Sequence, residues 1–264
     1  MAKVVNGGNK KGKVGSSIFY TIKNSNNKVT QGERIYQPNV TNPQSESQRA
    51  QRMKMKPATN FYAALSSILD HSFEGVKYGA MSRQFFLQQA IGKTQEVFPY
   101  LLKGENKFVP GPYLISKGKL NSVAWSLLNG AINIEVKNSE DDVDNSQIGA
   151  VSRGLIAKNA SLRNGDQITL VSVVEQNTAN GSQFIPVIGR FLIDTENEVD
   201  WEDVVPNYSV TTTGTNATIQ PLVGGAQATL AGCCVIVSRK NVNGGEVWQR
   251  STERMAISDR VYNM

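Results

Sequence analysis

The chain has 264 residues, of which 39% are hydrophobic, and its 28 Lys and Arg outnumber 22 Asp and Glu. This length predicts one or two domains. No run approaches the ~18 apolar residues of a membrane span. The first residues lack the apolar run of a secretory signal, and Ala2 stands where myristoylation needs Gly. We therefore expect no membrane partner and synthesis in a cytoplasm.

Positive charge is concentrated near the N-terminus. Residues 1–56 hold 11 Lys and Arg against 2 acidic residues, a net charge of +9, whereas residues 57–264 hold 17 against 20, a net charge of −3. Such asymmetry is typical of a segment that meets a polyanion, or of an arm that docks on an acidic neighbouring subunit. The candidate nucleic-acid or subunit contacts are Lys10, Lys11, Lys13, Lys23, Lys28, Arg34, Arg49, Arg52, Lys54 and Lys56.

The N-terminal segment combines a polar start with a predicted hairpin. Residues 1–13 are rich in Gly, Asn and Lys without an apolar period, so we expect them to be flexible unless something holds them. Residues 14–22 and 28–36 are β-prone, and the turn-rich residues 23–27 between them predict a β-hairpin. Because an isolated hairpin is marginal in water, it needs the body or a partner to lie on.

Three helices are predicted next. Asn42 as N-cap and Pro43 at the first helical position predict a helix that ends at Pro57. Apolar residues at helical spacing predict a second helix over residues 59–73. Residues 81–91 form a third candidate, with Gly as a stop signal after them.

The remainder of the chain is rich in strand and turn patterns. Proline and glycine in residues 99–122 predict an ordered loop around a short extended piece at 113–115. Expected hairpin turns lie at 179–182 and 243–245. The expected strands are 131–136, 150–156, 167–174, 184–193, 208–213, 229–238 and 246–249. Many short strands with such spacers predict an antiparallel β-sandwich or small barrel.

The predicted fold class is therefore α+β, with three regions. Residues 1–56 form a basic arm with the hairpin and first helix, and residues 57–122 form a helical and loop region. Residues 123–264 form a β-rich domain. No repeat of fixed period is present.

Residue types that carry chemistry are scarce. His71 is the single histidine, so any Ser-His-Asp or Cys-His arrangement must use it. Its position favours a residue at the C-terminal end of a helix. Cys233 and Cys234 lie in an apolar run, which predicts two buried core residues and no zinc site. The acidic run 139–145 lacks the Gly and Glu positions of an EF-hand loop, so a solvated loop is favoured.

The chain lacks the sequence patterns of common enzymes. No glycine pattern matches a nucleotide-binding loop, and no serine motif of the familiar hydrolases occurs. We therefore expect no enzyme, cofactor or metal, although an unfamiliar hydrolase that uses carboxylates of the β-rich domain stays as a minor alternative. Phe19, Tyr20 and Tyr36 among the lysines can bind single strands by charge and stacking. Such binding is phosphate-dominated and salt-sensitive, since few arginines are present.

Two stretches resemble a known group of proteins. They are residues 12–15 followed by Arg34 and residues 42–52, and then residues 113–120. Their order and spacing are similar to an uncharacterised group of small proteins from Bacteroidota and their phages and mobile elements. The similarity covers about the first half of the chain and brings no functional residues with it. It implies a phage-type structural context rather than a catalyst.

Together these patterns predict a bacteriophage virion structural or assembly protein. Residues 1–40 would form an arm that reaches a neighbouring subunit, the genome, or both, and that becomes ordered on assembly. The expected partners are other copies of the chain, other virion proteins, and DNA or RNA. The expected location is the host cytoplasm during synthesis and then the virion. The alternative is a host-side or mobile-element nucleic-acid-binding module.

Overall fold

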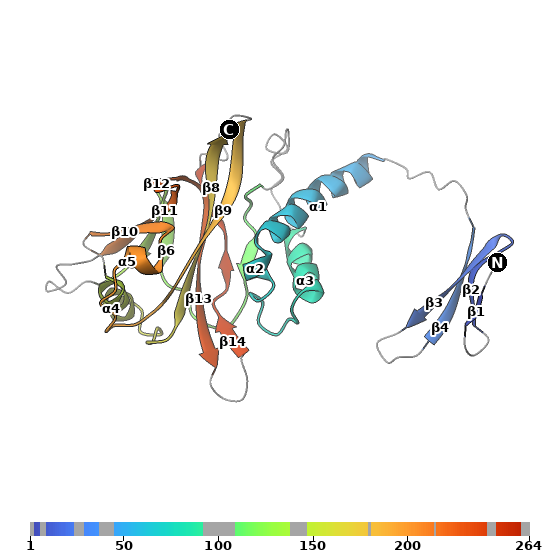
Figure 1. Ribbon diagram of the computed structural model, residues 1–264, viewed down its shortest axis with the longest axis horizontal. Coiled ribbons are helices and arrows are strands. Elements are labelled where there is room, and N and C mark those ends of the chain that lie inside the picture. Colours follow the sequence, from blue (N-terminus) through green and yellow to red (C-terminus); the bar gives the residue numbers. More distant parts are fainter. Residues whose placement is uncertain are drawn as a thin grey trace. The chain divides into compact units, whose positions relative to one another are not determined.

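The computed structural model describes residues 3–5, 9–23, 29–36, 45–91, 109–137, 147–178, 181–213, 215–241 and 247–259. The chain divides into two compact units, residues 1–49 and residues 50–264. Both helices and mostly antiparallel strands occur in the described part, as the α+β class predicts (Figure 1). Residues 57–122 and 123–264 belong to the same compact unit, here called the body.

The first unit contains an antiparallel sheet, here called the N-terminal sheet. Its strands lie in the order β1 (Lys3–Val5), β2 (Asn9–Val14), β3 (Ser17–Lys23) and β4 (Val29–Ile35). The predicted hairpin is confirmed as β3 and β4, which pair antiparallel along their whole length. Residues 1–13 were expected to be flexible unless something holds them, and their described part pairs as β1 and β2 through main-chain groups, which needs no apolar period.

The helices of the body differ from the prediction at one proline. They are α1 (Glu46–Ala64), α2 (Ser66–Leu69) and α3 (Ala80–Ala90). The predicted stop at Pro57 is wrong, since α1 continues through it. A proline inside a helix costs about 3 kcal/mol or more, and burial of Phe61 and Leu65 in the following turns offsets this cost. The third helix agrees within one residue, and the predicted cap at residues 42–43 lies outside the described residues.

Two antiparallel sheets build the rest of the body. The first has the order β14-β13-β8-β9, with β16 beside β13, and the second has the order β10-β11-β7-β6, with β12 beside β11. Neither sheet closes on itself, so the small barrel expected as one alternative is wrong. The bounds in the first sheet are β8 Gln167–Thr178, β9 Gly181–Leu192, β13 Thr229–Asn241, β14 Val247–Arg250 and β16 Ala256–Ile257. Those in the second are β6 Trp125–Leu128, β7 Ala131–Glu135, β10 Tyr208–Thr213, β11 Asn216–Val223 and β12 Ala226–Gln227. A separate pair joins β5 (Leu114–Ser116) to β15 (Glu253–Arg254).

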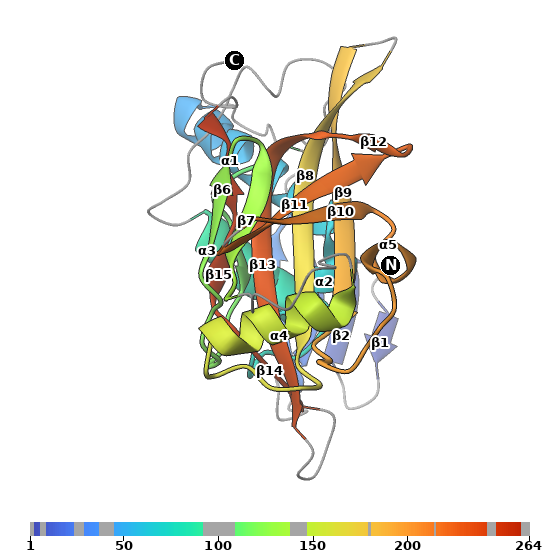
Figure 2. The same ribbon diagram turned by 90° about the vertical axis from the view of Figure 1, so that its left-hand side faces the viewer.

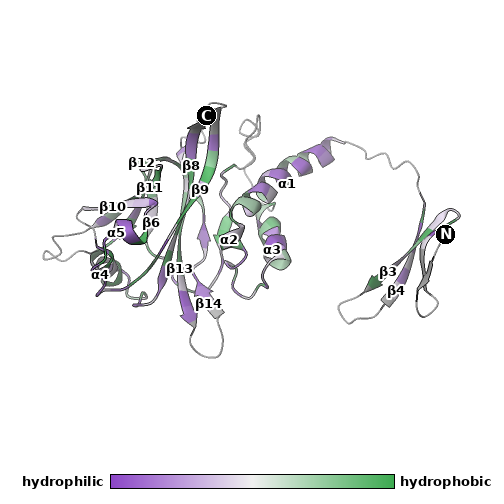
Figure 3. Cartoon of the chain, viewed as in Figure 1, coloured by the Kyte–Doolittle hydropathy of each residue, from purple (hydrophilic) through white to green (hydrophobic). Residues whose placement is uncertain are grey.

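The central part of the first sheet is buried on both faces. Alternate residues of β8 point to opposite sides: Ile168 and Leu170 pack with residues of the second sheet, whereas Val171 and Val173 pack with α1 to α3. Such burial explains the continuous apolar runs of β8 and β13. Figure 1 shows the resulting order of layers, from the helices through the first sheet to the second, and Figure 3 shows apolar colour along β8 and β9.

One predicted strand is a helix. Residues 150–156 were expected to be extended, but they lie in α4 (Ile148–Lys158), which crosses the strands in Figure 2. Ile148, Val151 and Leu155 are buried at spacings of three and four residues in the cluster between the sheets, so packing selects the helix. β6, β11 and the short helix α5 (Trp201–Val204) were not predicted.

Candidate functional site

The N-terminal sheet gathers cations and aromatic rings on one face. Lys13 pairs with Ile18, and Ile18 pairs with Arg34, so these residues point to the same side of the sheet. Alternate residues along β3 and β4 point to this side as well, which adds the remaining residues of the face. We call this side the cationic face; it consists of Lys13, Ile18, Tyr20, Ile22, Arg34 and Tyr36. The Lys13 ammonium lies 3.4 Å from the centroid of the Tyr36 ring, within cation–π range.

In the described strands of this sheet, no acidic side chain belongs to the cationic face. Glu33 of β4 pairs with Phe19 and therefore belongs to the opposite face. Tyr20 lies across β4 at Gly32, where an added Cβ would come within 2.6 Å of the ring. The glycine thus lets the tyrosine ring cover the neighbouring strand. A flat ring beside exposed cations can contact a phosphate backbone and stack on a base.

The opposite side of the sheet, here called the apolar face, carries Val14, Phe19 and Ile35. Val14 pairs with Ser17, and Ser17 pairs with Ile35, which places Val14 and Ile35 in one row. Ile35 is 75% exposed and Val14 is 46% exposed. An exposed isoleucine and valine in one row favour contact with another apolar surface.

Neither face is covered by described residues of the sheet's own unit, residues 1–49. No described side chain between residues 12 and 36 is buried. Yet β3 carries apolar residues at both parities, with Ile18, Tyr20 and Ile22 on one side and Phe19 on the other, and Figure 3 shows apolar colour on this strand. Strands of this kind are typical of sheets that are covered on both faces. This two-sided pattern was readable in the sequence, but only the pairing register assigns each residue to a face.

Three more of the predicted cations lie on the same strands. Lys10 and Lys11 belong to β2, and Lys23 ends β3. Lys28 lies outside the described residues. The structure therefore brings Lys13 and Arg34 together in one row and places Lys10, Lys11 and Lys23 elsewhere along these strands.

The predicted cations of residues 49–56 lie on α1. Arg49, Arg52 and Lys56 are spaced by three and four residues, so they share one face of the helix, and all three are exposed. Lys54 is half-buried and lies toward the side that carries Phe61. This stripe is a second cationic surface, carried by a helix instead of a sheet.

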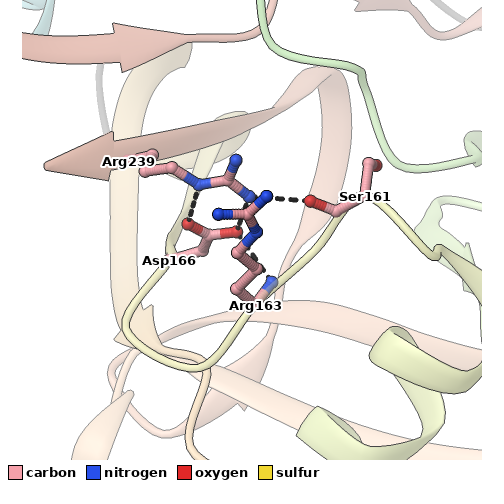
Figure 4. A network of polar contacts seen from close by, with 4 residues as sticks. All are labelled: Ser161, Arg163, Asp166 and Arg239. Atoms are coloured by element: carbon pink, nitrogen blue, oxygen red, sulfur yellow. Dashed lines mark hydrogen bonds and ion pairs between the residues drawn. The ribbon is translucent and has the colours of Figure 1, made fainter. Parts of the chain in front are cut away.

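A buried ion pair in the body serves the fold. Arg239 donates from Nε to Asp166 Oδ1 at 2.7 Å and from Nη2 to Asp166 Oδ2 at 2.7 Å (Figure 4). Nη2 also donates to the Ser161 carbonyl at 2.7 Å, and the Arg163 backbone N–H donates to Asp166 Oδ2 at 2.9 Å. The hydrogen bond to Asp166 raises the pKa of the Arg239 guanidinium. Because the carboxylate has its partners inside the fold, it is not open to a ligand.

The adjacent cysteines and the single histidine are the other residues that could carry chemistry. Cys233 and Cys234 are free and buried, as predicted, and burial raises the pKa of the Cys233 thiol to about 12. His71 follows α2, is exposed, and its ring centroid lies 4.2 Å from that of Tyr78. Among the described residues no group of three His, Cys, Asp or Glu side chains could hold a metal ion. The acidic run 139–145 and the turn at 243–245 lie outside the described residues.

Comparisons with known proteins give no assignment. No protein-family model matches the chain, and no curated protein or solved structure shows detectable similarity to it. In the part of the chain that the structure describes, no helix combines the length and apolar character required to cross a bilayer. A functional proposal therefore rests on the geometry of the two units.

Proposed function

We propose that the chain is a non-catalytic structural or assembly protein of a bacteriophage virion, and that its N-terminal sheet packs against a neighbouring subunit. The observation behind this proposal is that the sheet carries apolar residues on both faces, and that its own unit buries none of the described side chains of residues 12–36. A sheet needs a packed face for stability, because exposed strands gain little from hydrophobic burial. A subunit that covers the apolar face would supply this packing.

Burial and charge both favour a second copy or another virion protein as the partner. Full burial of one aliphatic side chain contributes about 1.5–3 kcal/mol, so covering Ile35 and Val14 alone would stabilise the contact substantially. The net charges of +9 in residues 1–56 and −3 in residues 57–264 are complementary between copies. In this proposal the two sheets of the body form a β-sandwich scaffold, and the protein moves from the host cytoplasm into the virion. The resemblance to phage proteins supports that context.

A single substitution on the apolar face tests the assembly proposal. Ile35→Lys should lower the oligomer mass measured by size-exclusion chromatography with light scattering, because a charge would be buried without a partner. Leu128→Lys is the matched control, since Leu128 is 58% exposed and belongs to the body. A wild-type chain that is a strict monomer at high concentration, and that is unchanged by deletion of residues 1–40, would contradict the proposal.

Nucleic-acid binding is the second candidate, favoured by the cationic face. Lys13 and Arg34 lie in one row with Tyr20 and Tyr36 on the same side, and no acidic residue shares that side in the described sheet. This arrangement suits a single strand held through its phosphates and stacked bases. Each phosphate contact contributes about −0.7 to the slope of log K against log salt for single strands.

Salt-dependent binding distinguishes this candidate. Combined Lys13→Ala and Arg34→Ala should weaken binding to single-stranded DNA and make the salt slope shallower by about 1–1.5. Lys137→Ala with Arg254→Ala is the control, since both residues are exposed cations of the body. If no DNA or RNA shows a salt-dependent shift, the candidate is removed while the assembly proposal stands.

A further inference from the structure

A groove of about 790 Å³ lies in the body between the first sheet and the connection from α2 to α3. The strand register builds one wall. Arg250 pairs with Ser238, and Ser238 with Gln167, while Thr169 pairs with Arg190 two residues further along β8. All five residues therefore lie on the helix-facing side of the sheet. Elsewhere on this side of the sheet, apolar residues pack against the helices, whereas these five residues are polar or charged.

The other wall comes from residues 71–78 after α2. Tyr78 is 62% exposed and its ring contacts His71 at a centroid distance of 4.2 Å, so the two rings support each other at the groove. Trp248 of β14 adds an indole from the sheet side, and Lys77 adds a cation. Planar rings thus line the same groove as the charged groups.

The charge of the groove is positive. Among the described residues that line it, Lys77, Arg190 and Arg250 are cationic and one residue, Glu74, is acidic. Glu74 Oε2 accepts the backbone N–H of Lys119 at 3.1 Å, so this carboxylate already has a partner. The ion pairs found among the described residues include neither arginine.

Arg190 and Arg250 place two guanidinium charges on the same groove. Burial lowers the pKa of Arg250 and the charge of Arg190 lowers it further, while Tyr78 opposes the shift. Arg250 is held in place by its Nη1–H, which donates to Ser238 Oγ at 2.8 Å. Two like charges in a half-buried groove favour an anion between them, because an anion relieves the repulsion and restores the lost solvation.

We propose that this groove binds a nucleotide unit, with its phosphate at Arg190 and Arg250 and its base against Tyr78 or Trp248. Guanidinium groups bind phosphate through two parallel hydrogen bonds, and aromatic side chains stack on bases of any type. The volume lies within the range of about 300–1,000 Å³ that is typical of small-molecule sites, so the groove is larger than a simple anion needs. The unit can be a free nucleotide or part of a strand. The site lies wholly in the body and does not depend on the N-terminal sheet.

Calorimetric titration of the full chain with ligands that differ in one chemical group tests this assignment. AMP should bind saturably and change the fluorescence of Trp248, and adenosine, which lacks the phosphate, should bind at least about tenfold more weakly. Arg190→Gln should weaken AMP binding about tenfold or more, whereas Arg254→Gln, an equal loss of exposed charge outside the groove, should leave it unchanged. Arg190 is exposed, so its replacement leaves the fold intact, and unchanged thermal unfolding of the variant verifies this.

The same titrations separate the sources of the ligand and can overturn the assignment. A short oligodeoxyadenylate whose Arg190-dependent binding is tighter than that of AMP identifies a strand as the ligand, and equal or weaker binding identifies the free nucleotide. Absence of saturable AMP and oligonucleotide binding overturns the proposal, as does equal affinity in Arg190→Gln and Arg254→Gln. Inorganic phosphate that binds as tightly as AMP also overturns it, because the rings would then contribute nothing.

Discussion

Replacing Asp166 by Asn removes one charge from the buried ion pair with Arg239 and changes almost no volume. The Asp166 side chain is 2% exposed and its two oxygens accept three hydrogen bonds, two from Arg239 and one from the Arg163 backbone. An asparagine amide has only one oxygen, so in either orientation its NH2 group faces a donor. The substitution therefore leaves the guanidinium without its counter-charge and with an unsatisfied contact.

The magnitude follows from the burial of the pair. Removing one partner of a buried ion pair costs about 3–5 kcal/mol, and the 22% exposure of the Arg239 side chain places this case near the lower end, about 3 kcal/mol. For a unit of this size each kcal/mol shifts Tm by about 2–4 °C, so Tm should fall by about 6–12 °C. Urea unfolding followed by circular dichroism measures the same loss as a lower midpoint.

A matched control comes from the surface. Glu135→Gln removes the ion pair between Glu135 and Lys158, which spans 2.9 Å with side chains 51% and 44% exposed. Solvent screening should limit its cost to below about 1 kcal/mol. Equal losses in Asp166→Asn and Glu135→Gln would refute the reasoning, because burial would then have no effect on the strength of the pair.

Three further predictions concern Glu253, the two adjacent cysteines and Gly118. Burial raises the pKa of Glu253, whose Oε1 has no hydrogen-bond partner among the described residues. Ionisation therefore opposes folding, so the wild type should lose stability relative to Glu253→Gln as pH rises from about 4 to about 7; a difference in unfolding free energy that stays constant over this range would contradict the assignment. Cys233 and Cys234 should react with a thiol reagent only as fast as the body unfolds, and rapid labelling of the native protein would show that they are accessible. Gly118→Ala would place a Cβ 2.0 Å from the Arg250 carbonyl oxygen, so it should lower the unfolding free energy by about 2 kcal/mol, and an unchanged urea midpoint would show that β14 moves without cost.

Elements with local signals could be predicted from the sequence. The hairpin of β3 and β4 and the helix α3 follow from patterns within about ten residues. Residues 150–156 show the limit of this reasoning. Their apolar run suits a strand, but Ile148, Val151 and Leu155 also match a helical period, and only packing between the two sheets selects the helix. Pro57 shows the same limit, because the burial of residues after it decides that α1 continues.

The candidate interface could be predicted in part. Composition alone identified Lys13 and Arg34 among the cations of residues 1–56, since net charge is independent of conformation. Composition could not show that these two share a face with Tyr20 while Glu33 lies on the other side. A shift of one residue in the pairing of β3 and β4 would exchange the faces, so that assignment belongs to the register.

The sequence by itself thus determined the charge asymmetry, the fold class and the burial of the adjacent cysteines, because each depends on composition or on near neighbours. Only the tertiary structure decided the groove. Tyr78, Arg190 and Arg250 come from segments far apart in the chain and match no local motif. They meet because β8 pairs with both β9 and β13, and because the helices pack on the side of that sheet that carries the two arginines. Such long-range contacts leave no periodic pattern in the sequence.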